Sequence, residues 1–295
     1  RELGVTPGRE TRALAAEIES GAPPREAAAK PRPLALTRPP RLIGRDRELA
    51  ALHSGWQRSA VVAVLGEAGV GKSRLIAEFA AHRAPAVSTG ARPGDTQIAF
   101  ALLARLLRAL PGLADAELPP WVRLQLGHLL PELGRPESPS LNPLRLRQAL
   151  LWLLGHLPAL HSGVIVIDDL QFADEATLEE LPALLEADIE PPLRWLLAAR
   201  SAEIPPLLRG VLEGGDPLRA TVVRLGPLAV ADVQALLDSL ALDSLDAAAW
   251  APPLHRHTGG NPMFILQTLL AMGDGPMGAS PSSPVAALPL PRRGR

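Results

Sequence analysis

One octapeptide of this chain has the residue types and spacing of a phosphate-binding loop. Residues 66–73 read Gly-Glu-Ala-Gly-Val-Gly-Lys-Ser and match G-x-x-x-x-G-K-[ST] at every fixed position. In such a loop the glycines let the main chain approach an anion, and successive N–H groups point toward it. The chain has 30 lysine and arginine residues, of which only Lys30 and Lys72 are lysines. We therefore expect the compact ammonium of Lys72 to reach the β- and γ-phosphates, where a planar guanidinium would crowd the loop.

Two adjacent carboxylates and one arginine are further candidates for chemistry on a nucleotide. Asp168 and Asp169 end one apolar, β-branched run, and Arg200 ends another. The carboxyl ends of parallel strands form the edge where ligands bind in open α/β folds. We expect Asp168 and the Ser73 hydroxyl to hold Mg²⁺, and Asp169 to orient and polarise the attacking water. Arg200 would sense or neutralise the γ-phosphate.

Each of these three residues also has a purely structural interpretation. Asp168 could be a loop carboxylate that caps a turn, and Asp169 could cap the turn at residues 171–172. Arg200 could form a salt bridge with either carboxylate. The sequence leaves these alternatives open.

The pattern of apolar residues predicts the elements that must position these side chains. Continuous apolar runs are typical of strands buried on both faces of a parallel sheet, and leucines with arginines at helical spacing are typical of covering helices. Strands that alternate with helices predict an α/β fold, a P-loop NTPase with a parallel sheet flanked by helices and a C-terminal helical lid. The expected strands are 60–65, 86–89, 163–169, 194–199 and 221–225. One expected helix ends near residue 53, and others span 72–82, 97–110, 121–130, 143–157 and the residues that Asp174 caps, to about 187. The whole of 227–271 is expected to be helical.

Composition restricts the class of protein further. The chain has 295 residues, a formal net charge of −1 and no cysteine. The charge gives no field to attract nucleic acid or an anionic membrane, so we expect no direct nucleic-acid binding by this segment. No apolar stretch reaches the length of a membrane span. The lack of cysteine is compatible with a reducing cytosol, and we expect a cytoplasmic location.

Proline and glycine predict the division into domains. We expect the end of a helical domain at 1–20, a proline-rich linker at 21–40, an ATPase core at 41–226, a helical lid at 227–273 and a disordered tail at 274–295. A short helix at 9–20 would be marginal alone. Since the chain also begins at Arg1 rather than Met, we expect it to be a fragment of a longer protein.

Three separated motifs resemble the ATPase module of bacterial STAND-class regulators, relatives of the AAA+ ATPases found in large transcriptional activators. Residues 44–49 read Gly-Arg-Asp-Arg-Glu-Leu, with Asp46 where this group usually has Glu. Residues 168–174 read Asp-Asp-Leu-Gln-Phe-Ala-Asp, with Phe172 where Trp is common. Residues 259–264 read Gly-Gly-Asn-Pro-Met-Phe. The resemblance covers about 41–272.

Residues 2–21 resemble the last helix of the bacterial transcriptional activation domain of SARP-type regulators. The resemblance implies an upstream effector or DNA-binding domain in the full protein, and self-association is possible. It implies ATP or ADP with Mg²⁺ as ligands. Gly44 and Arg45 would border the adenine, Pro262 would touch the base from the lid, and Arg200 would occupy the sensor position. The phosphates would be held by Gly66, Glu67, Ala68, Gly69, Val70, Gly71, Lys72 and Ser73.

Our leading hypothesis is a nucleotide switch in which ATP closes the helical lid over the core and an effector domain reads the state. Two alternatives stay open. One is an AAA+ ring ATPase acting on DNA or protein, against which the near-zero net charge counts. The other is a scaffold that binds nucleotide without hydrolysing it. For Asn261, the only role that the sequence itself suggests is a tight turn entering the last helix.

Overall fold

The computed structural model describes residues 39–81, 87–134, 140–160, 163–190, 192–214, 218–242 and 245–273. The predicted N-terminal helix, the C-terminal tail and the linker up to residue 38 lie outside the described residues, so these three segments stay predictions.

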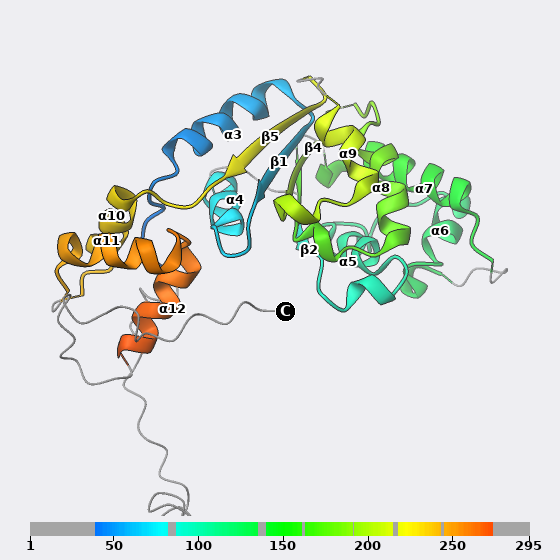
Figure 1. The fold of residues 1–295 in the computed structure, drawn as a ribbon. Coiled ribbons are helices and arrows are strands. Elements are labelled where there is room, and N and C mark those ends of the chain that lie inside the picture. The colour runs from blue at the N-terminus through cyan, green and yellow to red at the C-terminus, as the bar shows by residue number, and fades with distance from the viewer. Residues whose placement is uncertain are drawn as a thin grey trace, which may run out of the picture.

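A five-stranded parallel sheet forms the centre of the fold, in the order β2-β3-β4-β1-β5 (Figure 1). Every pairing in it is parallel. Strand β4 therefore lies between β1 and β3, and the residues that follow β1, β3 and β4 meet at the carboxyl edge. The predicted parallel α/β fold is confirmed. The strands are β1 Val61–Gly66, β2 Val87–Gly90, β3 Val164–Asp168, β4 Arg194–Ala199 and β5 Ala220–Leu225.

The central strand β1 is apolar throughout because both of its faces are covered. Every residue of β1 is buried. Since successive side chains on a strand point to opposite faces, Ala63 and Leu65 belong to one hydrophobic cluster, while Val62 and Val64 belong to another. A polar residue at any of these positions would leave an unpaired polar group in a core.

Helices cover both faces of the sheet. The cluster on one face includes residues of α3 and α4, and the larger cluster on the other includes residues of α5 to α9. Helix α9 has no counterpart among the predicted helices. The bounds are α3 Asp46–Arg58, α4 Lys72–Ala80, α5 Ala101–Ala109, α6 Pro120–Leu126, α7 Pro143–His156, α8 Glu175–Leu185 and α9 Pro206–Glu213.

The predicted end of α3 near residue 53 was wrong, because the helix continues to Arg58. Gly55 has the residue type of a helix stop, but here it lies against β5. A Cβ added to Gly55 would be 2.7 Å from Thr221 Cγ2. The next residue, Trp56, packs edge-on against Phe79 of α4. Close packing, rather than a helix terminus, therefore explains this glycine.

Three C-terminal helices have a hydrophobic core of their own. They are α10 Val230–Ser239, α11 Ala247–Thr258 and α12 Pro262–Gly273. Their cluster includes Val233, Trp250, Leu254 and Ile265 and contains no buried residue of the sheet. Figure 1 shows these helices gathered at one end of the molecule, away from α6 and α7. The helical character predicted for this part of the chain is confirmed.

Candidate functional site

The loop at residues 66–73 joins β1 to α4 and has the backbone of an anion cradle. Gly69 and Gly71 have φ of +75° and +103°, in the left-handed region that favours glycine. Helix α4 begins at Lys72, directly after the loop. The first N–H groups of a helix have no intrahelical acceptor, so they point toward the space in front of the loop. The loop therefore presents N–H donors where a phosphate would lie.

Lys72 is buried in this loop, with 7% of its surface exposed. Its Nζ donates to the carbonyl oxygens of Gly66 at 3.0 Å and Glu67 at 3.1 Å. Burial lowers the pKa of Lys72, which the carboxylates of Asp169 and Asp168 partly offset. The pKa of Lys72 is lowered further by the nearby charge of Arg200.

The structure thus brings four of the predicted residues together. The charges of Asp168, Asp169 and Arg200 all act on the Lys72 ammonium. The two carboxylates and the two cations therefore follow three neighbouring strands at the carboxyl edge of the sheet.

The two aspartates lie at the end of β3 and are held by different donors. Asp168 Oδ1 accepts from the N–H of Asp169 at 2.7 Å. Asp169 has φ of +54°, which is uncommon for a residue other than glycine. Its Oδ1 accepts from Nε2 of Gln171 at 2.8 Å, and it makes no side-chain cap on the short turn Leu170–Phe172. The capping role considered for Asp169 is therefore wrong.

Arg200 follows β4, the strand between those that carry the loop and the aspartates. Its Nη1 pairs with Glu203 at 2.9 Å, and its guanidinium lies 5.1 Å from the centre of the Phe172 ring. No ion pair joins Arg200 to Asp168 or Asp169 among the described residues, so the alternative of such a salt bridge is wrong. The positive charge of Arg200 nevertheless acts on Lys72, whose pKa it lowers.

The donors at this edge fit a magnesium ion bound together with phosphates. Asp168 Oδ2 accepts no hydrogen bond from the described residues, and Ser73 is exposed in the first turn of α4. No group of three or more His, Cys, Asp or Glu side chains that could hold a metal occurs in the described part of the chain. Mg²⁺ usually takes one or two protein oxygens together with phosphate oxygens and water. A carboxylate and a hydroxyl beside the loop match that donor set.

A mostly apolar cavity of about 400 Å³ adjoins the loop. Apolar walls with a few polar groups are typical of sites for flat organic ligands. Pro262 and Arg45 line it, whereas Gly44 is not among its lining residues, and the contact of all three with a base stays a prediction. The remaining lining residues are Pro39, Arg41, Leu42, Ile43, Gly69, Val70, Gly71, Arg74, Leu228, Leu236, Met263, Leu266, Gln267 and Leu270.

The two residues predicted to border the base at the start of α3 are engaged with the protein itself. Arg45 is 5% exposed, and its Nη2 donates to the carbonyl oxygens of Val70 at 3.0 Å and Gly226 at 2.8 Å. A Cβ on Gly44 would lie 2.8 Å from Cβ of Asp232 in α10. Arg45 therefore joins the loop to the segment that leads into α10, and Gly44 packs against that helix.

The start of α12 contacts the loop directly. Nδ2 of Asn261 donates to the carbonyl of Ala68 at 2.8 Å, and the N–H of Met263 donates to the carbonyl of Gly69 at 3.2 Å. Oδ1 of Asn261 also accepts from the N–H of Met263 at 3.0 Å. The turn predicted at Asn261 is present, but the contact with the loop was not predicted.

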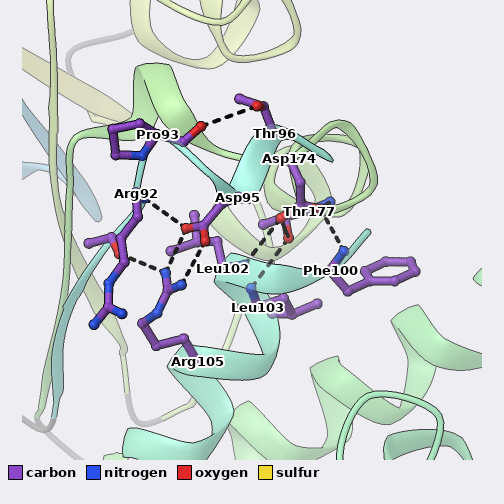
Figure 2. Close-up of polar contacts among 11 residues, drawn as sticks. Arg92, Pro93, Asp95, Thr96, Phe100, Leu102, Leu103, Arg105, Asp174 and Thr177 are labelled. Carbon is purple, nitrogen blue, oxygen red and sulfur yellow. Dashed lines mark hydrogen bonds and ion pairs between the residues drawn. The ribbon is translucent and has the colours of Figure 1, made fainter. Parts of the chain in front are cut away.

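The last aspartate of the motif at 168–174 has a structural role. Asp174 is 1% exposed and accepts from Thr177 of α8, as the predicted cap does. It also accepts from the N–H groups of Phe100 at 2.7 Å and Leu102 at 3.1 Å, at the start of α5. Figure 2 shows it between these two helices, beside the ion pair of Asp95 and Arg105. Asp174 therefore fixes the segment that follows the two site aspartates.

Sequence reasoning missed Gln171 and the loop contact of Asn261. Gln171 stands two residues after Asp169 inside the motif, and its amide is the only group there that both donates and accepts. Asn261 is similarly a polar residue within a short glycine-rich motif. Each signal is an amide side chain in a motif whose other residues were assigned to contacts with the metal, the attacking water or the base.

A parallel sheet, a glycine-rich loop between strand and helix, and carboxylates on a neighbouring strand define a P-loop nucleoside triphosphatase fold. A family model described as an AAA ATPase domain matches residues 41–196. The chain therefore belongs to the AAA ATPase domain family and contains an ATPase module. No curated protein matches it.

Solved structures share this fold at low sequence identity. A Walker-type ATPase of Pyrococcus abyssi is 18% identical, with a TM-score of 0.52 over 78% of this chain and 67% of that one. The Aeropyrum pernix ORC2 protein in ADPNP–ADP complexes is 14% identical, with a TM-score of 0.51 over 79% and 63%. A STAND protein with a tetratricopeptide repeat sensor from Pyrococcus horikoshii is 18% identical, with a TM-score of 0.48 over 76% and 29%.

The likenesses to the Walker-type ATPase and to ORC2 concern the fold alone, and the chain spans only part of the length of each of the three proteins. Among the helices that the structure describes, none has both the length and the apolar character needed to cross a bilayer.

Proposed function

We propose that this chain is a cytoplasmic, ATP-dependent switch module of a bacterial transcriptional regulator, and that it hydrolyses ATP to reset. The observation that carries the proposal is the direct contact between α12 and the phosphate-binding loop, through Asn261 and Met263. A nucleotide that reshapes the loop thereby changes the contacts of the C-terminal helices. This gives ATP and ADP a way to favour different arrangements of those helices, which a switch requires.

The proposed chemistry assigns one task to each polar side chain at the edge of the sheet. The loop amides and Lys72 bind the β- and γ-phosphates, with Lys72 exchanging its carbonyl acceptors for phosphate oxygens. Asp168 and Ser73 hold the Mg²⁺ ion, which neutralises phosphate charge when it is bound. Asp169 orients the attacking water and accepts its proton, and Arg200 stabilises charge on the γ-phosphate.

The cavity beside the loop receives the base in this proposal. Its walls come from the segment before α3, from the loop and from α12, with Pro262 at the start of α12. A base in this cavity would contact both the core and the C-terminal helices at once. The division into an ATPase core at 41–226 and a lid at 227–273 remains part of the proposal.

The transcriptional role depends on the sequence alone. It is supported by the likeness of residues 2–21 to the end of an activation domain and by the STAND-like motifs at 44–49, 168–174 and 259–264. An upstream effector or DNA-binding domain in the full reading frame would support this part of the proposal.

Binding and hydrolysis are tested by calorimetry and phosphate release on the purified protein. We expect Mg·ATP to bind and turn over slowly. The Asp169→Asn variant should keep its affinity but lose hydrolysis, since an amide cannot take the proton, whereas Asp168→Ala should weaken Mg·ATP binding. If wild-type protein binds Mg·ATP but releases no phosphate, the chain is a scaffold rather than an enzyme.

The switch is tested by fluorescence energy transfer between exposed positions on α7 and α11, through Gln148→Cys and Arg256→Cys. The chain has no cysteine of its own, so these thiols are the only labelling sites. We expect different transfer efficiencies in the ATP, ADP and ligand-free states. Equal efficiencies in all three states contradict the switch. Hexamers in sizing together with DNA-stimulated turnover would instead support a ring ATPase.

A further inference from the structure

We propose that Gln171 is a positioning residue that holds the Asp169 carboxylate for hydrolysis and connects it to the end of β4, where Arg200 lies. This inference rests on the proposed hydrolysis of ATP. It concerns a side chain to which neither the motif nor the fold gives a role.

The amide of Gln171 bridges two parts of the site through two hydrogen bonds. Nε2 donates to Oδ1 of Asp169 at 2.8 Å, and Oε1 accepts from the backbone N–H of Arg200 at 3.1 Å. The orientation of the amide is fixed by its partners. A carboxylate only accepts and a backbone N–H only donates, so turning the amide over would break both contacts.

Each partner has a structural need that Gln171 meets. The β4 ladder ends at Leu197 on the β3 side and at Ala199 on the β1 side, so the N–H of Arg200 lies beyond the sheet. Asp169 has a left-handed backbone, and its side chain makes no cap on the turn that follows. A single side chain thus provides an acceptor for Arg200 and a donor for Asp169.

This arrangement has a consequence for catalysis. With Oδ1 of Asp169 held by Gln171, the carboxylate has a fixed rotation, and Oδ2 is the oxygen left to accept from a water. The same short turn carries Phe172, whose ring lies 5.1 Å from the Arg200 guanidinium. The contacts of Gln171 and Phe172 therefore fix the position of Asp169 relative to Arg200. A displaced carboxylate would leave nucleotide binding intact but misplace the water.

The competing interpretation is that Gln171 only ties down the backbone of Arg200. Two variants separate the interpretations. Gln171→Leu has similar bulk but loses both hydrogen bonds. Gln171→Glu is isosteric and still accepts from the N–H of Arg200, but it replaces the donor to Asp169 with a second negative charge. If Gln171 only ties down the backbone of Arg200, Gln171→Glu should therefore hydrolyse ATP as wild type does. If Gln171 positions Asp169, hydrolysis should fall in this variant.

The test measures kcat for ATP hydrolysis and Kd for Mg·ATP in wild type, both variants and the control Gln57→Leu, an exposed glutamine on α3. We expect kcat to fall about tenfold to a hundredfold in both Gln171 variants, with Kd within about twofold of wild type. The control should behave as wild type. A Gln171→Glu variant with wild-type kcat overturns the proposal while leaving the proposed function intact. Absent turnover in wild type overturns both.

A second readout needs neither nucleotide nor turnover. In ¹⁵N-labelled protein, the side-chain amide signals of Gln171 are assigned by their absence in Gln171→Leu. We expect these signals to shift in Asp169→Asn, because the charged acceptor becomes a neutral one, while the amide signals of Gln57 stay in place. Unshifted Gln171 signals in Asp169→Asn would mean that the two side chains do not meet in solution, and would overturn the proposal.

Discussion

Lys72 illustrates, at the scale of single residues, how a binding site can work against the stability of the free protein. Lys72 is 7% exposed, and among the described residues its ammonium has two hydrogen-bond partners, the carbonyl oxygens of Gly66 and Glu67. Burial of a charge without a full set of partners is unfavourable, and this is why burial lowers the pKa of Lys72. Phosphates would supply the missing partners, so the side chain is more favourably placed in a complex than in the free protein.

We therefore predict opposite effects of Lys72→Met on stability and on binding. The ligand-free variant should melt no lower than wild type, since methionine has no charge to desolvate. Added Mg·ATP should raise the melting temperature of wild type but not of the variant, because binding stabilises only the form that binds. Differential scanning fluorimetry with and without Mg·ATP measures both effects. A ligand-free variant that melts well below wild type would show that Lys72 stabilises the free fold.

The difference in stability between wild type and Lys72→Met should change with pH in one direction. At neutral pH Lys72 is charged in both the folded and the unfolded chain, and the folded state carries the unfavourable burial. Its pKa is lower in the folded state, so raising the pH through that lowered pKa removes the proton there first, and wild type gains stability relative to Lys72→Met. The advantage of the variant in urea unfolding should shrink between pH 7 and pH 10. A constant difference would contradict a lowered pKa.

The residue types of the site could be predicted from the sequence, but their partners could not. The positions of Lys72, Asp168 and Arg200 follow from a motif and from apolar runs that end in polar residues. The partners of Arg200, namely Glu203 and the Phe172 ring, depend on rotamers and on the path of the chain after β4. Such choices depend on free-energy differences too small for a residue pattern to reveal.

At the scale of elements, Asp174 connects two helices that are far apart in the sequence. It caps α8 through Thr177 and also accepts from Phe100 and Leu102 at the start of α5 (Figure 2). The cap on α8 could be predicted from neighbouring residues. The contact with α5 spans more than 70 positions and exists only because β2 pairs with β3, which brings the segment after β2 beside the motif.

Asp174 should therefore be important for stability rather than for chemistry. We predict that Asp174→Ala lowers the free energy of unfolding by about 2–4 kcal/mol, since a buried carboxylate with four donors is lost. Asp174→Asn should cost less, because one acceptor oxygen remains. Urea unfolding followed by circular dichroism measures both values. Each carboxylate oxygen of Asp174 accepts from both helices, so equal losses in the two variants would contradict a stabilising role for the oxygen that Asp174→Asn keeps.

Asp95 and Arg105 form a second connection in the same region, with two contacts of 2.7 Å between the guanidinium and the carboxylate. The hydrogen bond from Arg105 lowers the pKa of Asp95, and so does that from the N–H of Arg92. A carboxyl group with a lowered folded-state pKa stabilises the fold above its unfolded pKa, and this contribution is lost as the pH falls through the lower folded value.

We predict that Asp95→Asn costs about 1–3 kcal/mol of unfolding free energy at pH 7. The difference between the variant and wild type should disappear as the medium is acidified below the ordinary aspartate range, where Asp95 in wild type also becomes neutral. Urea unfolding of both proteins at pH 7, 4.5 and 3 measures the trend. A difference that persists unchanged at pH 3 would show that the ion pair is not its source.

For the whole molecule, the sequence predicts an α/β part and a C-terminal helical part, but not the contacts between them. Residues 227–271 have a helical pattern, and the helices α10–α12 bury their own core. Asn261 and Met263 join them to the phosphate-binding loop by hydrogen bonds, and Ile43 and Gly44, which precede α3, pack against them. A residue pattern reveals periodic apolar faces, but the hydrogen bonds to the loop end on backbone carbonyls, which no residue type indicates.

Asn261 offers a way to separate the folding of α12 from its contact with the loop. Asn261→Asp keeps the oxygen that accepts from the N–H of Met263, but it lacks the donor to the carbonyl of Ala68 and places a negative charge there. The helix start should therefore survive while the connection to the loop is lost. We predict that the ligand-free variant populates an arrangement with α10–α12 further from the core.

The measurement is energy transfer between labels at Gln148→Cys and Arg256→Cys, with Asn261→Asp compared with wild type in the ligand-free state and with Mg·ADP. We expect lower transfer or a broader distribution in the ligand-free variant, and an unchanged melting temperature of the core. Leu242→Ala is the matched control, since this partly buried leucine lies between α10 and α11 and packs against the core of the C-terminal helices, away from the loop. If Asn261→Asp gives the wild-type distribution, the contact with Ala68 does not hold the helices in place. The bond from the N–H of Met263 to the carbonyl of Gly69 and the packing of Gly44 against Asp232 are then the remaining connections to be tested.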